Sequence, residues 1–278
     1  GGALFARSYG QTVTVNLDPI EKKPLYHFLP GSSILSIGPN GCTFTCDNCQ
    51  NWHISQEKSP TRYLAPAELV ALASRGGSIG VAFTYTEPLL YFEYLLDAAP
   101  LLRAAGLKSV LVTNGFLNEA PAREIAPLID AFNVDLKSIR DEFYRKYCGG
   151  RVEPVKRFIE IAAAVSHVEV TNLVVPGLND APRDFEDLAA WLAGVAPAVP
   201  LHFSRFFPQY RMEDRPPTPP ETLEAAYRIA KKRLHYVYVG NIFIDGTEDT
   251  RCGKCGGVVV RRSGYGAEVL GAGGRCPA

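Results

Sequence analysis

The feature that most constrains the fold of this chain is a repeated alternation of strand-like and helix-like segments. Short apolar runs such as residues 79–85 alternate with longer amphipathic stretches such as residues 155–165. This pattern predicts βα units and a parallel sheet, because consecutive parallel strands need a crossover that is usually a helix. The expected strands span residues 33–38, 79–85, 109–113, 131–136, 168–175, 201–206 and 236–239, and the expected helices span residues 66–75, 88–105, 155–165, 183–195 and 223–234, with one more beginning near residue 119.

The number of these units predicts an α/β fold of the partial (β/α)6-type barrel kind. About six or seven units fall short of the eight in a complete barrel, and in such folds the chemistry lies at the carboxyl ends of the strands. We expect three regions. They are an N-terminal β hairpin and lead-in over residues 1–32, the barrel over residues 33–240, and a cysteine-containing tail over residues 241–278. The hairpin is predicted to turn at Tyr9-Gly10.

Composition limits the partners and the compartment. The 29 basic and 29 acidic side chains cancel, so neither nucleic acid nor an acidic membrane is an expected partner. No apolar run approaches the roughly 18 residues of a membrane span. The start, Gly1-Gly2-Ala3, has neither an initiator methionine nor a signal-peptide pattern, which indicates a fragment or a processed product. Seven cysteines, an odd number, favour metal binding in a reducing cytoplasm over a disulfide framework.

Three of the cysteines, Cys42, Cys46 and Cys49, lie within eight residues, just after an expected strand. Three thiolates this close can converge on one iron–sulfur cube, which would leave one of its four irons open to an outside ligand. They can also converge on one zinc ion, although structural zinc sites usually have four protein ligands. Three unrelated thiols are the remaining alternative.

Polar residues follow the next three strands in the same way. They are Glu87, Asn114 and the pair Asp135 and Lys137, whose spacing places both side chains on one side of their strand. Each has an ordinary explanation: a helix N-terminal acid, a loop cap and a surface ion pair. Their shared position at successive strand ends nevertheless favours a common site over a metal-binding structural module, the non-enzymatic alternative.

The Cys-x3-Cys-x2-Cys spacing, placed after the first strand of a βα series, resembles the signature of the radical S-adenosylmethionine (SAM) superfamily. The resemblance implies a 4Fe–4S cluster on Cys42, Cys46 and Cys49, with the amino and carboxylate groups of SAM on the fourth iron. It also implies reductive cleavage of SAM to methionine and a 5′-deoxyadenosyl radical, which abstracts hydrogen from a substrate.

Other stretches resemble the SAM pocket of this superfamily and of its pyruvate formate-lyase activating enzymes. They are Tyr85-Thr86-Glu87-Pro88 in place of Gly-Gly-Glu-Pro, Thr113-Asn114-Gly115, Asp135-x-Lys137, and a strand that starts at Thr171-Asn172 and ends in Val-Pro-Gly. A lone strand histidine is more often structural, but His202 stands at a strand end, with Arg205 and Tyr210 as alternatives. The resemblance therefore implies SAM contacts from Tyr85, Thr86, Glu87, Asn114, Asp135, Lys137, Asn172 and His202.

Residues 18–31, 49–55 and 237–241 extend the resemblance to the radical SAM enzyme of the AmmeMemoRadiSam system. The first hypothesis for the reaction is glycyl-radical activation of a partner protein. The alternative is radical modification of a small molecule or of another protein, with AMMECR-like and Memo-like proteins as partners. An electron donor such as flavodoxin or ferredoxin is also implied.

The tail carries a second cysteine group, Cys252, Cys255 and Cys276. Cys252-x-x-Cys255 followed by two glycines looks like a zinc-ribbon knuckle, and Cys276-Pro277-Ala278 looks like half of another. Zinc is the favoured ligand, an auxiliary iron–sulfur cluster is second, and thiols without metal are third. Cys148, alone in a loop, is interpreted as structural.

Overall fold

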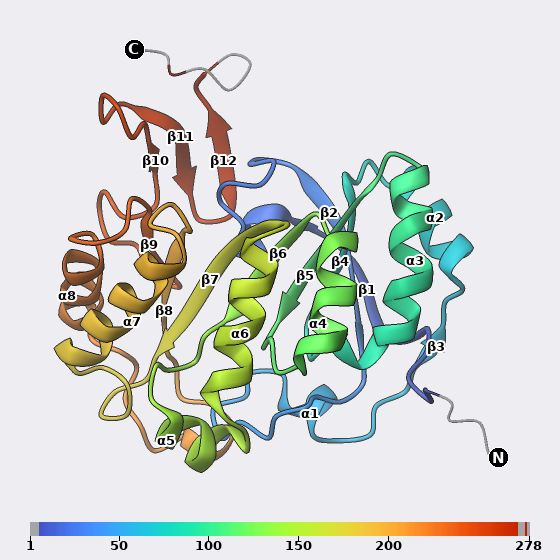
Figure 1. Cartoon of the computed structure of the whole chain (residues 1–278), viewed down its shortest axis with the longest axis horizontal. Helices are drawn as coiled ribbons and strands as arrows, with labels where there is room; N and C mark the ends of the chain where they lie inside the picture. Colours follow the sequence, from blue (N-terminus) through green and yellow to red (C-terminus); the bar gives the residue numbers. More distant parts are fainter. Residues whose placement is uncertain (1–5, 272–275, 277–278) are drawn as a thin grey trace.

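The computed structural model describes residues 6–271 and residue 276 (Figure 1). Its main feature is a nine-stranded sheet in the order β3-β1-β2-β4-β5-β6-β7-β8-β9. Every neighbouring pair from β2 to β9 is parallel. The strands are β1 Gln11–Pro19, β2 Ser33–Pro39, β3 Arg62–Tyr63, β4 Gly80–Phe83, β5 Lys108–Thr113, β6 Ala131–Asp135, β7 His167–Val174, β8 Leu201–Arg205 and β9 Val237–Gly240. The predicted α/β class with a parallel sheet is confirmed, and the sheet stays open because its edge strands, β3 and β9, do not pair.

The main helices lie along one face of the sheet, in front of it in Figure 1. Three of them begin with proline, at Pro66, Pro182 and Pro220, where a missing N–H leaves no helical bond unmade. The expected helix over residues 88–105 is in fact a short 3-10 turn followed by a longer helix. The helical segments are η1 Ile20–Lys22, α1 Trp52–Ser55, α2 Pro66–Arg75, η2 Pro88–Tyr91, α3 Phe92–Ala104, α4 Glu119–Ile125, η3 Ala126–Leu128, α5 Asp141–Phe143, η4 Tyr144–Cys148, α6 Val152–Ala163, α7 Pro182–Val195, η5 Tyr210–Met212 and α8 Pro220–Ala230.

The prediction of a hairpin that turns at Tyr9-Gly10 is wrong for the residues that the structure describes. Strand β1 begins after this turn, at Gln11, and pairs antiparallel with β2 along its length and with β3 at its start. The first half of the expected hairpin includes residues 1–5, which lie outside the described residues. The alternation of Val13 and Val15 with polar residues therefore marks a strand whose partner is not adjacent in sequence.

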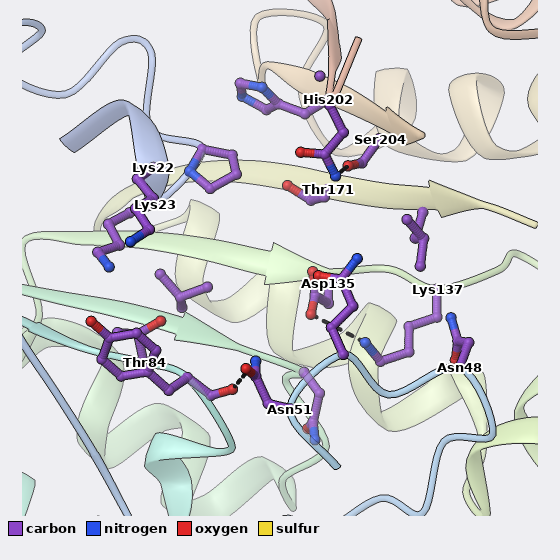
Figure 2. Close-up of a pocket in the computed structure, with 18 of the residues that line it drawn as sticks. Lys22, Lys23, Asn48, Asn51, Thr84, Asp135, Lys137, Thr171, His202 and Ser204 are labelled. Atoms are coloured by element: carbon purple, nitrogen blue, oxygen red, sulfur yellow. Dashed lines mark hydrogen bonds and ion pairs between the residues drawn. The ribbon is translucent and has the colours of Figure 1, made fainter. Parts of the chain in front are cut away.

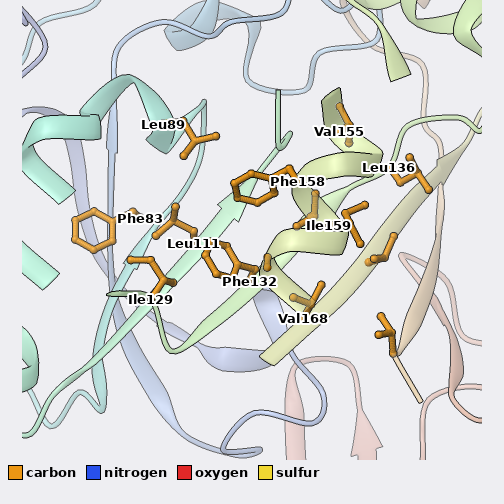
Figure 3. Packing of buried hydrophobic residues seen from close by; sticks show 14 of the residues in the cluster. Phe83, Leu89, Leu111, Ile129, Phe132, Leu136, Val155, Phe158, Ile159 and Val168 are labelled. Carbon is orange, nitrogen blue, oxygen red and sulfur yellow. The ribbon is translucent and has the colours of Figure 1, made fainter. Parts of the chain in front are cut away.

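Buried apolar side chains fill the space between the helices and the sheet (Figure 3). Helix α6 turns Val155, Phe158 and Ile159 toward the sheet, at the three- and four-residue spacing of one helix face. Phe158 meets Phe132 of β6 edge to face, with ring centroids 5.5 Å apart. Packing on this face fixes the strands from behind and leaves the opposite face of the sheet free to line a cavity.

The tail forms a separate antiparallel sheet from β10 Thr250–Arg251, β11 Val258–Ser263 and β12 Gly266–Val269. In Figure 1 it stands, in red, beside the blue lead-in segment that precedes β2. Arg262 joins the two, because its guanidinium donates to the carbonyl oxygen of Tyr26 at 2.6 Å and to Thr250 Oγ1 at 2.7 Å. None of the described helices is long and apolar enough to cross a membrane.

Candidate functional site

The inner face of the sheet lines a cavity of about 1020 Å³. Strand ends, the loop that carries the first cysteine group, the lead-in segment and the tail together form its wall. Figure 2 shows Asp135, Lys137 and Asn51 on one side of the pocket, with Lys22 and Lys23 apart from them. The structure thus brings Asn114, Asp135 and Lys137 into one chamber with Cys42, Cys46 and Cys49.

The cysteine loop is tied to the barrel by backbone hydrogen bonds on both sides. The amides of Thr45 and Asp47 donate to the carbonyl oxygens of Cys148 and Tyr147, each at 2.9 Å. The side chain of Gln56 donates to the carbonyl oxygen of Phe44 at 3.0 Å. The loop is therefore held from two directions, and its conformation does not depend on a bound metal alone.

One aromatic stack and one close contact of a glycine add to this support. The ring of Trp52, which begins α1 just after the loop, stacks on Tyr210 with centroids 5.3 Å apart. A Cβ at Gly150 would lie 2.3 Å from the ring of Phe44, so only glycine lets η4 approach the loop this closely. Cys148 is fully buried beside the loop, in agreement with a structural role.

The thiols of the loop face several donors inside the cavity. The Asn114 side-chain amide lies 3.6 Å from the Cys42 sulfur and donates to Thr43 Oγ1 at 2.9 Å. Cys49 Sγ lies 3.1 Å from Ser55 Oγ. Burial raises the pKa of the Cys42 thiol to about 12, because the Phe44 amide and Lys137 compensate a thiolate there only in part. A bound metal would supply that compensation.

Asp135 and Lys137 lie at the cavity end of β6 and form an ion pair of 3.1 Å. Burial is the largest single effect and disfavours the charged amine, but Asp135 together with Cys46, Cys148 and Tyr144 outweighs it, so the pKa of Lys137 lies above its ordinary value. The pair offers a carboxylate and an ammonium side by side. This arrangement complements a ligand that carries both an amino and a carboxylate group.

Glu87 does not line the cavity, which corrects the expected SAM contact. It is fully buried and caps η2, since its Oε1 accepts from the Leu89 amide at 2.9 Å and from Thr113 Oγ1 at 2.6 Å. Its Oε2 accepts from the Asn114 amide at 2.8 Å, and burial raises its pKa to about 7. Glu87 therefore positions Asn114, and the ordinary explanation of a helix N-terminal acid applies.

Tyr85 and Thr86 do line the cavity, as expected. Tyr85 has φ 74, in the left-handed region that favours glycine, at the place where the resembling family has glycine. The Asn51 side chain donates to the Tyr85 carbonyl oxygen at 2.8 Å, and the Tyr85 hydroxyl donates to Asp18 at 2.8 Å. These contacts hold a backbone conformation that a non-glycine residue rarely adopts.

Asn172 also lies outside the cavity, and the reason is the alternation of the strand. Its side chain points to the other face of β7, where it donates to the carbonyl oxygens of Leu136 and Lys137 at 2.7 and 3.2 Å. Thr171 takes the inward position, in register with Asp135 on β6 and His202 on β8. Thr171 is the member of the pair that lines the cavity, and a contact between Asn172 and SAM stays a prediction.

His202 lines the cavity, but its ring nitrogen Nε2 is 2.6 Å from Oε2 of the buried Glu169. The same carboxylate accepts from the amides of Tyr26 and His27 and bonds to His167. Burial opposes the charge on Glu169, but these partners outweigh it and hold the pKa of the carboxyl well below its usual range. A contact between His202 and SAM stays a prediction.

The tail cysteines form a compact group. The sulfur atoms of Cys252, Cys255 and Cys276 all lie within 4.8 Å of one another. The amides of Cys255 and Lys254 lower the pKa of the Cys252 thiol to about 7. In the described part of the chain no other group of three or more metal-ligating side chains is as compact. The sulfur atoms of Cys42, Cys46 and Cys49 therefore lie further apart than those of the tail.

Several cavity residues were missed by the sequence reasoning. They are Glu21, Lys22, Lys23, Tyr26, Thr171, Glu248 and Tyr265, of which all but Thr171 belong to the lead-in and the tail. The stretch of residues 18–31 entered only as part of a family resemblance. Its density of charged and aromatic residues was the available signal.

The open parallel sheet with three thiols at the end of its first parallel strand defines a radical SAM protein. The model of the radical SAM superfamily matches residues 36–192, and the chain belongs to this family of enzymes. It is 40% identical over 275 residues to the uncharacterized protein MJ0808 of Methanocaldococcus jannaschii, covering 97% of this chain and 82% of that one.

Two further likenesses are more distant. The chain is 26% identical over 156 residues to the pyruvate formate-lyase-activating enzyme of Clostridium pasteurianum, covering 54% of this chain and 65% of that one. A domain of pyruvate-formate lyase-activating enzyme from Bacteroides vulgatus superposes with a TM-score of 0.52 at 20% identity, covering 58% of this chain and 99% of that one. The latter shows the likeness of fold alone. The family assignment decides against the metal-binding structural module.

Proposed function

We propose that this chain holds a 4Fe–4S cluster on Cys42, Cys46 and Cys49 and cleaves SAM reductively, so that a 5′-deoxyadenosyl radical abstracts hydrogen from a ligand in the cavity. The observation that carries this proposal is the position of the three thiols in the wall of a large cavity, at the carboxyl end of a parallel strand. The donor set fits the cluster, since three thiolates leave one iron open and iron–sulfur clusters are held by thiolates.

The chain's own residues would bind and orient SAM. The ammonium of Lys137 suits the carboxylate of SAM, and Asp135 keeps that ammonium charged. The backbone at Tyr85 and the hydroxyl of Thr86 face the same chamber and suit the amino group. Asn114, fixed by Glu87, stands beside the Cys42 sulfur, where a hydrogen bond tunes a metal-bound thiolate.

Two substrate classes each have a supporting observation. Glycyl-radical activation of a partner protein is supported by the relatives named as activating enzymes. Radical modification of a small molecule is supported by the cavity itself, since lead-in and tail residues form part of its wall. We favour the small molecule on this ground. Another protein as substrate, with AMMECR-like and Memo-like partners in an AmmeMemo pathway, is the further alternative.

We also propose an electron donor such as flavodoxin or ferredoxin. We propose that the protein works in the cytoplasm, which agrees with seven cysteines that form no disulfide in the described chain. In the tail we propose zinc on Cys252, Cys255 and Cys276, with a second iron–sulfur cluster as the alternative, because their separation suits a single ion. We propose that the N-terminal lead-in, the barrel and the tail are separate regions, divided at residues 32/33 and 240/241.

The test is anaerobic reconstitution with iron and sulfide, followed by dithionite and SAM. We expect a 4Fe–4S absorption and EPR spectrum that changes on addition of SAM, and formation of 5′-deoxyadenosine. Protein that carries the cluster but yields neither the spectral change nor 5′-deoxyadenosine would contradict the proposal. Mixing with a glycyl-radical protein then separates the substrate classes, since only the activating enzyme produces a glycyl EPR doublet.

A further inference from the structure

Cys148 is the one cysteine that the two proposed metal sites do not use, and it lies against the cysteine loop. It ends η4 and is fully buried outside the cavity wall, whereas Cys46 is part of that wall. The side chains of the two residues are joined by a hydrogen bond between their sulfur atoms. A small apolar residue would fill the same space, so the contact with Cys46 is the feature that needs an explanation.

The backbone fixes this contact on both sides of Cys46. The amide of Thr45 donates to the carbonyl oxygen of Cys148, and the amide of Asp47 donates to that of Tyr147, each at 2.9 Å. Both residues that flank Cys46 are therefore held by the end of η4. The position of Cys46 relative to Cys148 does not depend on the two side chains alone.

Two glycines after Cys148 let the loop come this close. Gly149 has φ 75, and a Cβ there would lie 2.7 Å from Thr45 Oγ1. The next residue, Gly150, packs against the loop as tightly. The close approach of residues 149 and 150 to residues 44 and 45 thus places the Cys148 thiol beside Cys46 without the help of a metal.

Each sulfur of the loop has a different neighbour. The thiols of Cys42 and Cys49 contact an amide and a hydroxyl group of other residues, as described above. For the sulfur of Cys46, Cys148 supplies the only hydrogen bond within the part of the chain that the structure describes. The sulfur of Cys148 likewise has no second hydrogen-bond partner among those residues.

Metal binding changes which of the two sulfur atoms donates. Cysteine binds metals as the thiolate, so Cys46 gives up its proton as a ligand and is left as an acceptor only. Cys148 is not a ligand and keeps its proton, so its S–H is the donor that remains in the pair. Hydrogen bonds to a ligand sulfur favour the more negatively charged, reduced state of an iron–sulfur cluster and raise its reduction potential.

We propose that Cys148 donates a hydrogen bond to the metal-bound sulfur of Cys46 and thereby raises the reduction potential of the 4Fe–4S cluster. Cys148 acts through Cys46 and touches neither SAM nor substrate, so it is a positioning residue. The inference rests on the proposed function, because it needs the cluster on the three cysteines of the loop. It adds a residue that the family resemblance does not include.

The first test is a redox titration followed by EPR, on anaerobically reconstituted protein without SAM. Cys148→Ala should lower the midpoint potential, because the reduced state loses a weak donor. We expect a change of about threefold in the equilibrium constant for reduction, which is about 30 mV for one electron. Cys148→Ser should bring the potential back toward that of the wild type, since a hydroxyl group also donates. Val152→Ala is the matched control, because it shortens a buried apolar side chain outside the cavity wall, and should leave the potential unchanged.

Infrared spectroscopy in the S–H stretching region tests the donor directly. The spectrum of the iron-loaded wild type minus that of Cys148→Ala isolates the band of Cys148. This band should lie at a lower frequency than that of free N-acetylcysteine, as for a thiol that donates to a thiolate, and Val152→Ala should retain it. If Cys148→Ala does not take up iron, Cys148→Ser replaces it in the difference spectrum.

An unchanged potential in Cys148→Ala, or an equal lowering in Val152→Ala, would overturn the inference. An S–H band at the frequency of the free thiol would do the same. A wild type that takes up no 4Fe–4S cluster would defeat the proposed function together with this inference. A shifted potential without formation of 5′-deoxyadenosine would defeat only the SAM chemistry and leave the role of Cys148 standing.

Discussion

The chain contains two groups of three cysteines, and their surroundings differ sharply. The loop group of Cys42, Cys46 and Cys49 lies in a cavity wall and is braced by α1 and η4. The tail group lies on a small antiparallel sheet, with its three sulfur atoms within 4.8 Å of one another.

The difference between the two groups lies in their geometry and not in the number of cysteines, and the two metals proposed for them differ in the geometry that they need. A tetrahedral zinc with bonds of about 2.3 Å holds its thiolates about 3.8 Å apart, close to what the tail presents. A cube distributes its thiolates over separate irons and needs a wider spacing. It also needs an open side, which the cavity supplies for the loop.

The largest effect is expected from a pair of variants, each of which removes one cysteine from one of the two groups. Cys46→Ala should abolish cluster loading and 5′-deoxyadenosine formation, because two thiolates do not hold the cube. Cys255→Ala should leave both intact. Iron analysis and product chromatography measure the outcome, and equal losses in the two variants would erase the distinction between the groups.

Removal of the tail metal should have the next largest effect. Structural zinc supplies folding free energy directly, so a chelator should unfold the small sheet β10–β12 while the barrel stays folded. Hydrogen exchange read by mass spectrometry should show lost protection over residues 250–269 and unchanged protection in β5 and β6. Metal analysis that finds no zinc in the purified protein would remove this half of the comparison.

A third prediction concerns Glu169 of β7, whose carboxylate connects the lead-in to strand β8. Glu169→Gln should lower the free energy of unfolding by about 3 kcal/mol, because the buried carboxylate accepts charge-assisted hydrogen bonds from His167 and His202. The folded pKa of Glu169 is depressed, so its contribution is complete above the unfolded pKa of about 4.3 and falls as the pH drops below it. Urea unfolding at pH 7 and pH 4 measures this, with Glu186→Gln as control. A stability difference between wild type and Glu169→Gln that does not shrink at pH 4 would argue against the charged pair.

The smallest effect is expected at the SAM pocket. Lys137→Gln should weaken SAM binding about tenfold, since a neutral amide replaces one charge-assisted contact while the three cysteines remain. Equilibrium dialysis of reconstituted protein with labelled SAM measures it. Glu186→Gln, exposed on α7 and outside the cavity wall, should leave the affinity unchanged, and a matching loss there would show that the effect of Lys137→Gln is not specific to the pocket.

The parallel sheet, most helices and both cysteine groups could be predicted because they depend on local pattern. Residues 66–75 were expected as a helix and form one with the same bounds, since proline starts it and an apolar face continues it. The prediction of a hairpin at Tyr9-Gly10 is wrong because β1 pairs with β2, which begins only at Ser33. The periodicity of a strand does not show which strand is its partner.

It was harder to predict which single side chains at the strand ends line the cavity. Asn172 lies outside the cavity wall because one step along a strand reverses its side, and a prediction of strand bounds with an error of one residue cannot resolve this. Glu87 lies beyond the end of β4, where it caps η2. Glu21 and Glu248 were missed because they line the cavity only through the way the lead-in and the tail fold back over the strands. No local spacing predicts that placement.

The stack of Trp52 on Tyr210 gives the protein an optical reporter. The sequence has two tryptophans, and only Trp52 adjoins the cysteine loop, while Trp191 lies on α7. An iron–sulfur chromophore in the loop absorbs where indole emits, so filling the loop quenches the fluorescence of Trp52. Trp191 retains its emission and serves as the internal standard. Cluster assembly and loss can then be followed in real time in unlabelled protein.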